Sequence, residues 1–166
     1  AIWDRSQQTL FIARDRLGIK PLFTARLGKS RLFASDIKAL WEVISPSGRL
    51  HAGAIYNYFI QSFISEVETS TRGIKKFPAS TYYLLTPKGE EKSVYWDLNR
   101  VRKTGRISFN EAVEKTEGLL RDAVRLRLRS DVSLGCFLSG GVDSSLVSAL
   151  AVTELENPVH TYSIGF

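Results

Sequence analysis

Seven consecutive residues, Ser139 to Ser145, combine glycine, hydroxyl and carboxylate groups in a pattern suited to holding phosphate; they read S-G-G-V-D-S-S. Two adjacent glycines let the main chain curl and bring its N–H groups close to an anion with no Cβ in the way. The serine hydroxyls add donors. Asp143 repels phosphate by its charge but can position a Mg²⁺ ion, directly or through water. We therefore interpret the segment as a loop that binds phosphate or pyrophosphate.

The elements expected to position this loop are a strand before it and a helix after it. Apolar runs predict a strand at 132–138, a helix that ends near Glu154, and a second strand at 159–165. This order predicts parallel strands with a right-handed crossover, and a ligand at the carboxyl end of the first strand. The helix N-terminus adds its dipole and its unpaired N–H groups. The substitution Gly141→Val is expected to block the turn and abolish pyrophosphate binding.

Other phosphate-binding motifs do not fit this segment. The G-x-x-x-x-G-K-[ST] loop requires a lysine, and the sequence has none between Arg129 and Phe166. The G-x-G-x-x-G dinucleotide turn is also absent. The simplest alternative is a serine- and glycine-rich turn that only begins a helix, because serine is a common N-cap. The register of all seven residues between strand and helix favours anion binding.

The composition is that of an ordinary globular protein, with 43% hydrophobic and 24% charged residues among 166. No apolar stretch approaches the roughly 20 residues that span a bilayer, so we expect no membrane partner. The single cysteine, Cys136, excludes an internal disulfide and fits a cytoplasmic, reducing compartment. The net charge of +6 is compatible with nucleic-acid binding, but the basic residues are scattered and no aromatic residues interleave with them, so we expect no nucleic-acid partner.

The rest of the chain predicts a mixed α and β fold. Strands are expected at 1–3, 9–13, 23–26, 31–34, 81–85 and 92–96, and helices at 36–43, with Ser35 as N-cap, and at 51–64. Ser108 and Glu111 form a capping box that begins a helix ending near Arg129. Its expected buried stripe comprises Ala112, Val113, Thr116, Leu119, Leu120, Ala123, Val124 and Leu128. The polar, basic stretch 99–105 separates the two parts, which gives domains 1–98 and 99–166.

Several conspicuous residues are interpreted as structural. Arg14, Asp15 and Arg16 predict an ion-paired loop that stabilises the fold. His51 and His160 lie far from other ligand-type residues, which predicts structural or solvated side chains. Cys136 lies within a predicted strand and is interpreted as a small buried residue.

With these pieces in order, the chain resembles glutamine-hydrolysing asparagine synthetases along essentially its whole length. The resemblance is carried by residues 1–4, 11–22, 33–40, 72–78, 95–98, 131–145 and 161–166. The loop itself looks like the pyrophosphate loop of N-type ATP pyrophosphatases. Two departures are mild: Val142 stands where leucine is usual, and Pro78-Ala79-Ser80 stands where Pro-Gly is more typical.

The resemblance implies an α+β / α/β fold in two domains. Residues 1–98 would be the C-terminal portion of a type 2 glutamine amidotransferase domain, an Ntn-type four-layer αββα fold, with its connector. Residues 99–166 would open a parallel-sheet domain of the adenine-nucleotide α hydrolase-like (PP-loop) kind with its first βαβ unit. The protein contains no methionine, and we expect an interior fragment of a longer protein.

The activity implied is that of a carbon–nitrogen ligase with glutamine as amido donor. One domain frees ammonia from glutamine with a terminal cysteine nucleophile. The other uses ATP and Mg²⁺ to form β-aspartyl-AMP, from which ammonia yields asparagine, with release of AMP and pyrophosphate. The family's cysteine lies upstream and its aspartate-binding residues lie downstream, so we expect no catalytic residue in this chain and no complete reaction. Cys136 is no substitute for the nucleophile.

The resemblance also implies a set of ligands. The expected partners are ATP, aspartate and glutamine, with a homodimer of the full-length protein. The nucleotide contacts would be Leu138, Ser139, Gly140, Gly141, Val142, Asp143, Ser144, Ser145 and Ile164, with Asp143 also toward Mg²⁺. Three alternatives stay open: a related amidotransferase or β-lactam-forming synthetase acting on another carboxylate, an inert ATP-binding homologue, and a basic nucleic-acid-associated protein.

Overall fold

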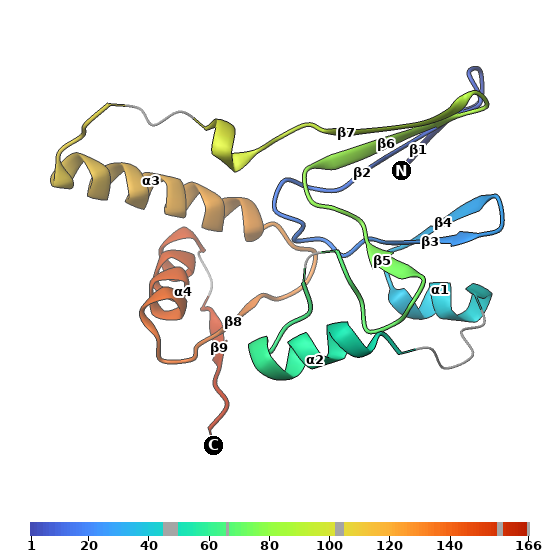
Figure 1. Ribbon diagram of the computed structural model, residues 1–166. Helices are drawn as coiled ribbons and strands as arrows, with labels where there is room; N and C mark the ends of the chain where they lie inside the picture. Colours follow the sequence, from blue (N-terminus) through green and yellow to red (C-terminus); the bar gives the residue numbers. More distant parts are fainter. Residues whose placement is uncertain (45–49, 66, 102–104, 156–157, 166) are drawn as a thin grey trace. The chain divides into compact units, whose positions relative to one another are not determined.

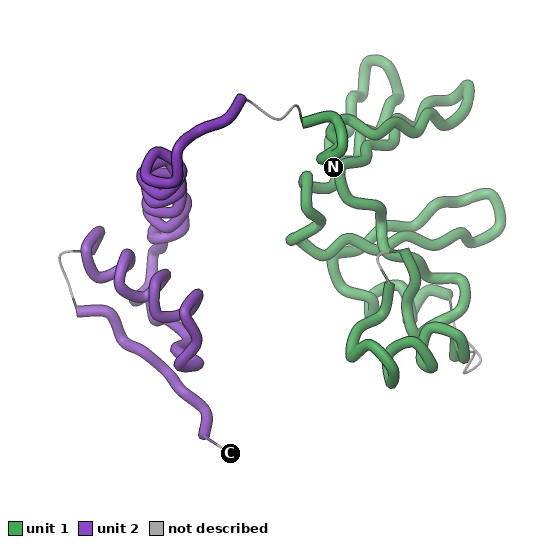
Figure 2. The backbone as a smooth tube through the Cα atoms, turned by 60° about the vertical axis from the view of Figure 1, so that its left-hand side comes forward, with its two compact units in different colours: residues 1–102 green, residues 103–166 purple. Residues whose placement is uncertain are grey.

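The computed structural model describes residues 1–44, 50–65, 67–101, 105–155 and 158–165. The chain divides into two compact units, residues 1–102 and 103–166, which Figure 2 distinguishes by colour. Figure 1 labels the helices and strands of both units. Each unit combines helices with small sheets, as the sequence predicts.

The first unit contains two antiparallel sheets. One has the strand order β1-β2-β6-β7, and the other has the order β4-β3-β5. The strands are β1 (Ile2–Asp4), β2 (Thr9–Ala13), β3 (Phe23–Leu27), β4 (Ser30–Ala34), β5 (Ile74–Lys76), β6 (Thr81–Thr86) and β7 (Gly89–Val94). In the first sheet, strands far apart in the sequence are paired: β2 lies beside β6, with Leu10 opposite Leu85.

Hydrophobic side chains join the two sheets face to face. Ile12 on β2, Tyr83 on β6 and Phe77 form a buried cluster, and Phe33 on β4 packs against it. Helix α1 (Ile37–Ile44) covers the opposite face of the β4-β3-β5 sheet, where its Leu40 contacts Ala25 and Ile74 (Figure 1). The unit is therefore layered as helix, sheet and sheet. Helix α2 (Ala52–Gln61) and the 3₁₀ turn η1 (Leu98–Arg100) complete it.

The second unit contains two helices and a pair of short strands. Its elements are α3 (Phe109–Arg127), β8 (Gly135–Phe137), α4 (Val142–Glu154) and β9 (His160–Tyr162). The strands β8 and β9 are parallel, which confirms the pairing expected of the βαβ unit. Val124 of α3 packs against Leu150 and Ala151 of α4, and this small cluster is the core of the unit.

The structure corrects several details in the first unit. The helix expected at 51–64 begins one residue later and ends at Gln61, because Ser62 adopts a left-handed conformation with φ of 61°. His51 precedes the helix, and its Nδ1 accepts a hydrogen bond from the Ala54 N–H. Strand β5 had no sequence prediction. Ser35 is not the cap of α1: the Asp36 carboxylate accepts the Lys38 N–H at 2.8 Å.

Other corrections concern strand length and helix burial. The first strand of the βαβ unit is Gly135–Phe137 rather than 132–138, and the second is His160–Tyr162 rather than 159–165. The second hairpin turns at residues 87–88, so β7 spans 89–94 rather than 92–96. Of the stripe expected on α3, Val124 is buried, but Val113, Thr116 and Leu119 are exposed. The expected boundary stretch 99–105 lies partly outside the described residues.

Candidate phosphate-binding loop

The loop from Ser139 to Ser145 lies between the end of β8 and the first turn of α4. Gly140 has φ of +81°, a left-handed conformation that glycine adopts without steric cost. Gly141 is the N-cap of α4 and has ordinary extended angles, φ −79° and ψ 161°. The turn therefore depends on glycine at position 140. A Cβ on Gly141 would meet only Ser139 Oγ, at 3.6 Å, so the backbone at position 141 does not itself require glycine, and the effect of the larger Gly141→Val substitution stays a prediction.

The backbone N–H groups of this loop are available to a ligand. Among the residues that the structure describes, the N–H groups of residues 140–144 have no hydrogen-bond partner. The regular bonds of α4 begin at Ser145, whose N–H donates to the Gly141 carbonyl at 3.1 Å. The first turn of any helix leaves such donors unpaired, and its dipole favours an anion there. Gly140 and Gly141 place two further N–H groups ahead of the helix.

The serine hydroxyls hold the loop in shape. Ser144 Oγ accepts the Ser139 N–H at 3.3 Å, donates to the Gly141 carbonyl at 3.1 Å, and lies 3.0 Å from Ser139 Oγ. The hydroxyl of Ser144 thus connects the start of the loop with the start of the helix. Ser145 is exposed on the first turn of α4.

Asp143 is the acidic residue in the first turn of α4. Its side chain is exposed, and the described residues contain no group of three or more His, Cys, Asp or Glu that could hold a metal ion. A Mg²⁺ ion at this position would therefore take one carboxylate from the protein and its other ligands from phosphate oxygens and water. Such a ligand set is usual for Mg²⁺ in nucleotide sites.

Leu138 and Ile164 follow the two parallel strands directly. The Leu138 N–H donates to the Tyr162 carbonyl at 2.8 Å, and its own carbonyl accepts the Ser163 hydroxyl at 2.6 Å. These bonds extend the strand pairing one step toward the loop. Leu138 is half-buried, whereas Val142 and Ile164 are 83% and 78% exposed.

Gly135 is a residue of this unit that the sequence analysis did not single out. A Cβ there would lie 2.6 Å from Tyr162 Cε2 and 3.2 Å from the His160 carbonyl oxygen. Glycine at this position lets the Tyr162 ring lie across β8. The sequence carries no signal for this, because the tyrosine is 27 positions away and its contact depends on the parallel pairing.

The segment Arg14–Arg16 has a structural role, carried out by hydrogen bonds to the main chain. The Arg14 guanidinium donates to the carbonyls of Lys20, Phe77 and Gly18 at 2.6–2.9 Å. The Asp15 carboxylate accepts the N–H groups of Ile19 and Lys20. The backbone hydrogen bond from Lys20 is the largest cause that lowers the Asp15 pKa, followed by the bond from Ile19. The pair thus shapes its own loop and ties it to the strand before residue 77.

The remaining isolated candidates lie outside the loop. His160 is exposed on β9. Cys136 is half-buried on β8, where it packs against the cluster of Val124, Leu150 and Ala151. Within the described part of the chain, no helix is long and apolar enough to span a membrane.

Comparison with protein families gives two consecutive matches. The family described as "Glutamine amidotransferase domain" matches residues 1–96, more than half of the chain. The family described as "Asparagine synthase" matches residues 115–166, which include the loop. The first match covers the layered unit, and the second begins within α3.

Several curated proteins are similar along most of the chain. Asparagine synthetase [glutamine-hydrolyzing] 3 of Bacillus subtilis is 35% identical over 100% of this chain and 28% of its own length. Putative asparagine synthetase [glutamine-hydrolyzing] 2 of Methanocaldococcus jannaschii is 33% identical over 99% of this chain and 33% of its own. Amidase chry2 of Gibberella zeae is 34% identical over 90% of this chain and 22% of its own. The chain spans about a third or less of the length of these relatives.

Proposed function

This chain belongs to the glutamine-hydrolysing asparagine synthetase family, and from that premise we propose that residues 138–145 and 164 bind ATP for adenylation of a carboxylic acid. Ammonia released from glutamine then displaces AMP to form an amide. In the whole protein the acid would be aspartate and the product asparagine. The observation that supports this best is the run of unpartnered N–H groups at residues 140–144, between a parallel strand and a helix of 13 residues.

The proposed chemistry of the loop is stabilisation of a leaving group. When the acid oxygen attacks the α-phosphorus of ATP, the bond to the bridging oxygen breaks and negative charge develops on the departing pyrophosphate. Main-chain N–H groups and the dipole of α4 stabilise that charge without having to reorganise. The Ser144 hydroxyl holds the N–H groups in place through its bonds to Ser139 and Gly141. Asp143 would hold a Mg²⁺ ion, which neutralises phosphate charge when bound.

We propose that residues 1–98 are the C-terminal portion of an Ntn-type αββα amidotransferase domain and residues 99–166 the beginning of a PP-loop domain. The helix–sheet–sheet layering of the first unit supports the former assignment. The strand–loop–helix–strand order with parallel β8 and β9 supports the latter. A cytoplasmic location and a homodimer of the whole protein are further proposals, which fractionation and sedimentation of the full-length protein test.

Isotope exchange tests the adenylation reaction in the full-length protein. Labelled pyrophosphate should exchange into ATP only when an acid substrate is present, because exchange requires reversible formation of the acyl-adenylate. A panel of acids that includes aspartate identifies the substrate and separates an asparagine synthetase from a related ligase acting on another carboxylate. Exchange without any acid, or no exchange with any acid of the panel, would contradict the proposal.

A further inference from the structure

A cluster of positively charged side chains lies in the first unit, in a cleft between its two sheets. Strand register shows which side chains face it. On the β4-β3-β5 sheet, Thr24 lies opposite Phe33 and Lys75, and Arg26 lies opposite Arg31. Directly opposed residues share a face, and Phe33 packs against the cluster between the sheets. The face that looks toward β6 therefore carries two arginines and a lysine.

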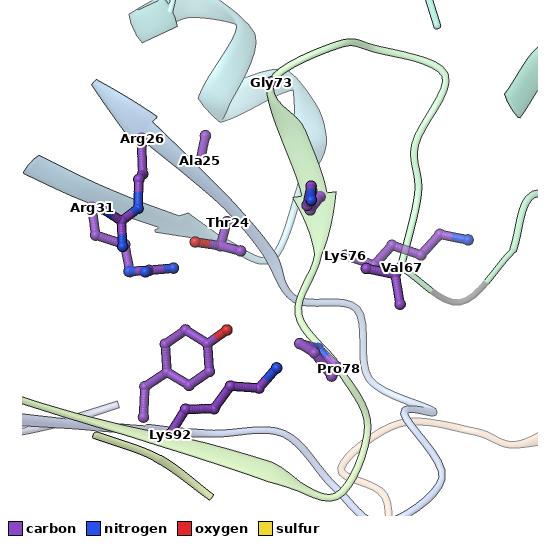
Figure 3. A pocket seen from close by; sticks show the side chains of 11 residues that line it. Thr24, Ala25, Arg26, Arg31, Val67, Gly73, Lys76, Pro78 and Lys92 are labelled. Carbon is purple, nitrogen blue, oxygen red and sulfur yellow. The ribbon is translucent and has the colours of Figure 1, made fainter. Parts of the chain in front are cut away.

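The facing sheet adds a further cation. Tyr83 belongs to the same cluster between the sheets, and Lys92 lies directly opposite it on β7. Glu90, two residues before Lys92, also faces inward. Figure 3 shows Arg26, Arg31 and Thr24 projecting from one side of the cleft and Lys92 entering it from the other. Arg26, Lys75 and Lys92 are exposed to solvent and Arg31 is partly buried, so the cations gather around the open part of the cleft rather than in a buried interior.

The charges in the cleft do not balance. The cleft has a volume of about 450 Å³, and none of its described lining residues is acidic. Glu90 reaches Arg31 with both oxygens, Oε1 and Oε2, at 2.6 Å from Nη2, and it lies 3.5 Å from Arg26. Glu90 is thus the carboxylate that Arg26 and Arg31 share, and among the described residues it makes no ion pair with Lys75 or Lys92. Like-charged residues placed directly opposite each other, as Arg26 and Arg31 are, destabilise a sheet, and the Glu90 carboxylate offsets that repulsion because it contacts both.

A second, independent observation is a buried hydroxyl without a partner. Thr24 lines the cleft, is 7% exposed, and its Oγ1 has no hydrogen-bond partner within the described residues. Buried polar groups in native proteins are almost always satisfied. A hydroxyl can donate to an anion, and the arginine fork fits the oxygens of phosphate. The centroid of the Tyr83 ring lies 4.9 Å from Arg31 Cζ and 5.8 Å from Lys92 Nζ, so the ring contacts one cation from each side of the cleft.

From this geometry we propose that the cleft is a binding site for a small phosphate-bearing anion, separate from the loop of the second unit. Arg26, Lys75 and Lys92 supply the charge, and the Thr24 hydroxyl supplies a directed hydrogen bond. The volume is in the range of small-molecule sites and leaves room for more than inorganic phosphate. An excess of three positive charges favours a dianion over a monocarboxylate. The site takes phosphate chemistry either as the free ion or as an organic phosphate.

The test is a titration of the 166-residue chain with inorganic phosphate and with ribose 5-phosphate, at constant ionic strength in chloride. Calorimetry gives the affinity, and backbone amide NMR shifts locate the site. We expect saturable binding with shifts at Thr24, Lys75 and Lys92. Tighter binding of ribose 5-phosphate would assign the site to organic phosphates, and equal binding would assign it to the free ion.

Two double variants make the test specific. Arg26→Gln with Lys75→Gln should weaken binding at least tenfold, whereas Arg5→Gln with Lys29→Gln removes the same charge from exposed positions of the unit and should leave affinity within twofold. Thr24→Val keeps the shape and should weaken binding severalfold. No saturable binding above chloride, an equal loss in both double variants, or shifts confined to residues 139–145 would each overturn the proposal. The last outcome leaves the function of the loop intact, so the two proposals fail independently.

Discussion

Replacing Gly140 and Gly141 by alanine, one at a time, tests whether the two positions differ in their need for glycine. Gly140 has φ of +81°, and nothing lies within 4 Å of a Cβ placed there. Gly141 has φ of −79° and an open Cβ position. An alanine at position 140 therefore incurs the left-handed penalty of about 1–2 kcal/mol without a clash. The same change at position 141 incurs none.

The difference in the free energy of unfolding between the two variants can be estimated, because both replace glycine by alanine. Replacing glycine by alanine stabilises by about 0.4–1 kcal/mol through the unfolded chain wherever the native angles suit both residues. That contribution is common to both variants, and the left-handed penalty of about 1–2 kcal/mol applies to position 140 alone. Gly141 is the N-cap of α4, where alanine is less favourable than glycine, so that cost offsets the gain and Gly141→Ala should be close to neutral. Gly140→Ala should be destabilising or should bend the loop.

Far-UV circular dichroism during urea unfolding measures this difference. Helices α3 and α4 contain 19 and 13 residues, against 8 and 10 in α1 and α2, so the signal at 222 nm reports mainly on the second unit. All three tryptophans, Trp3, Trp41 and Trp96, lie in the first unit, and their fluorescence is the internal control. Calorimetry with pyrophosphate should show the larger loss of affinity for Gly140→Ala. Equal effects of the two variants, or a larger effect at Gly141, would refute the conformational argument.

Three further predictions concern groups with defined partners. Arg14→Ala removes the side chain that donates hydrogen bonds to three main-chain carbonyls, and it should lower the free energy of unfolding by about 2–4 kcal/mol. Urea unfolding followed by tryptophan fluorescence measures this loss. The control, Arg16→Ala, should change the free energy of unfolding by less than about 0.5 kcal/mol. Asp15 has a lowered pKa in the folded state, so its stabilisation is complete above the ordinary value of about 3.9 and is lost as the pH falls through the folded value. The stability gap between wild type and Asp15→Asn should therefore shrink on acidification from pH 7 to pH 3, and a constant gap would argue against the role of the charge. Gly135→Ala should displace the Tyr162 ring and destabilise the second unit by about 1 kcal/mol. Hydrogen exchange should show this as a loss of amide protection in β8 and β9, whereas unchanged protection would show that the exposed ring moves aside freely.

The sequence predicts the local parts of this protein well. Apolar runs separated by glycine-containing turns predict two features that the structure contains. One is the hairpin of β3 and β4, and the other is the order strand, loop, helix and strand around Gly140. Ser108 caps α3 as predicted, since its Oγ accepts the Glu111 N–H, but the Glu111 carboxylate binds Lys115, so only the serine half of the capping box is confirmed. The Glu111 carboxylate pairs with Lys115, as i,i+4 spacing predicts. Such features depend on residues within a few positions of one another.

The features that the sequence does not predict depend on distant residues. Strand β5 has only three residues, and it forms because β3 offers it an edge. Helix α2 leaves large apolar side chains exposed, with Phe59 at 80%, and the sequence of the helix does not show this. Two adjacent glycines look alike in the sequence, so only the backbone angles distinguish Gly140 from Gly141. The cations of the cleft lie on strands separated by up to 66 positions, Arg26 to Lys92, and register alone brings them together.

The pairing of β2 with β6 has a consequence for the order in which the chain folds. Leu10 must find Leu85, although all three strands of the other sheet and the helices α1 and α2 lie between them in the sequence. In the second unit, by contrast, the paired strands are only about 25 positions apart, as Gly135 and His160 show. Rates fall as native contacts become less local. After dilution from denaturant, the helical signal of α3 and α4 should recover before the tryptophans reach their native emission, so the loop at residues 139–145 would form while the two sheets of the first unit are still incomplete.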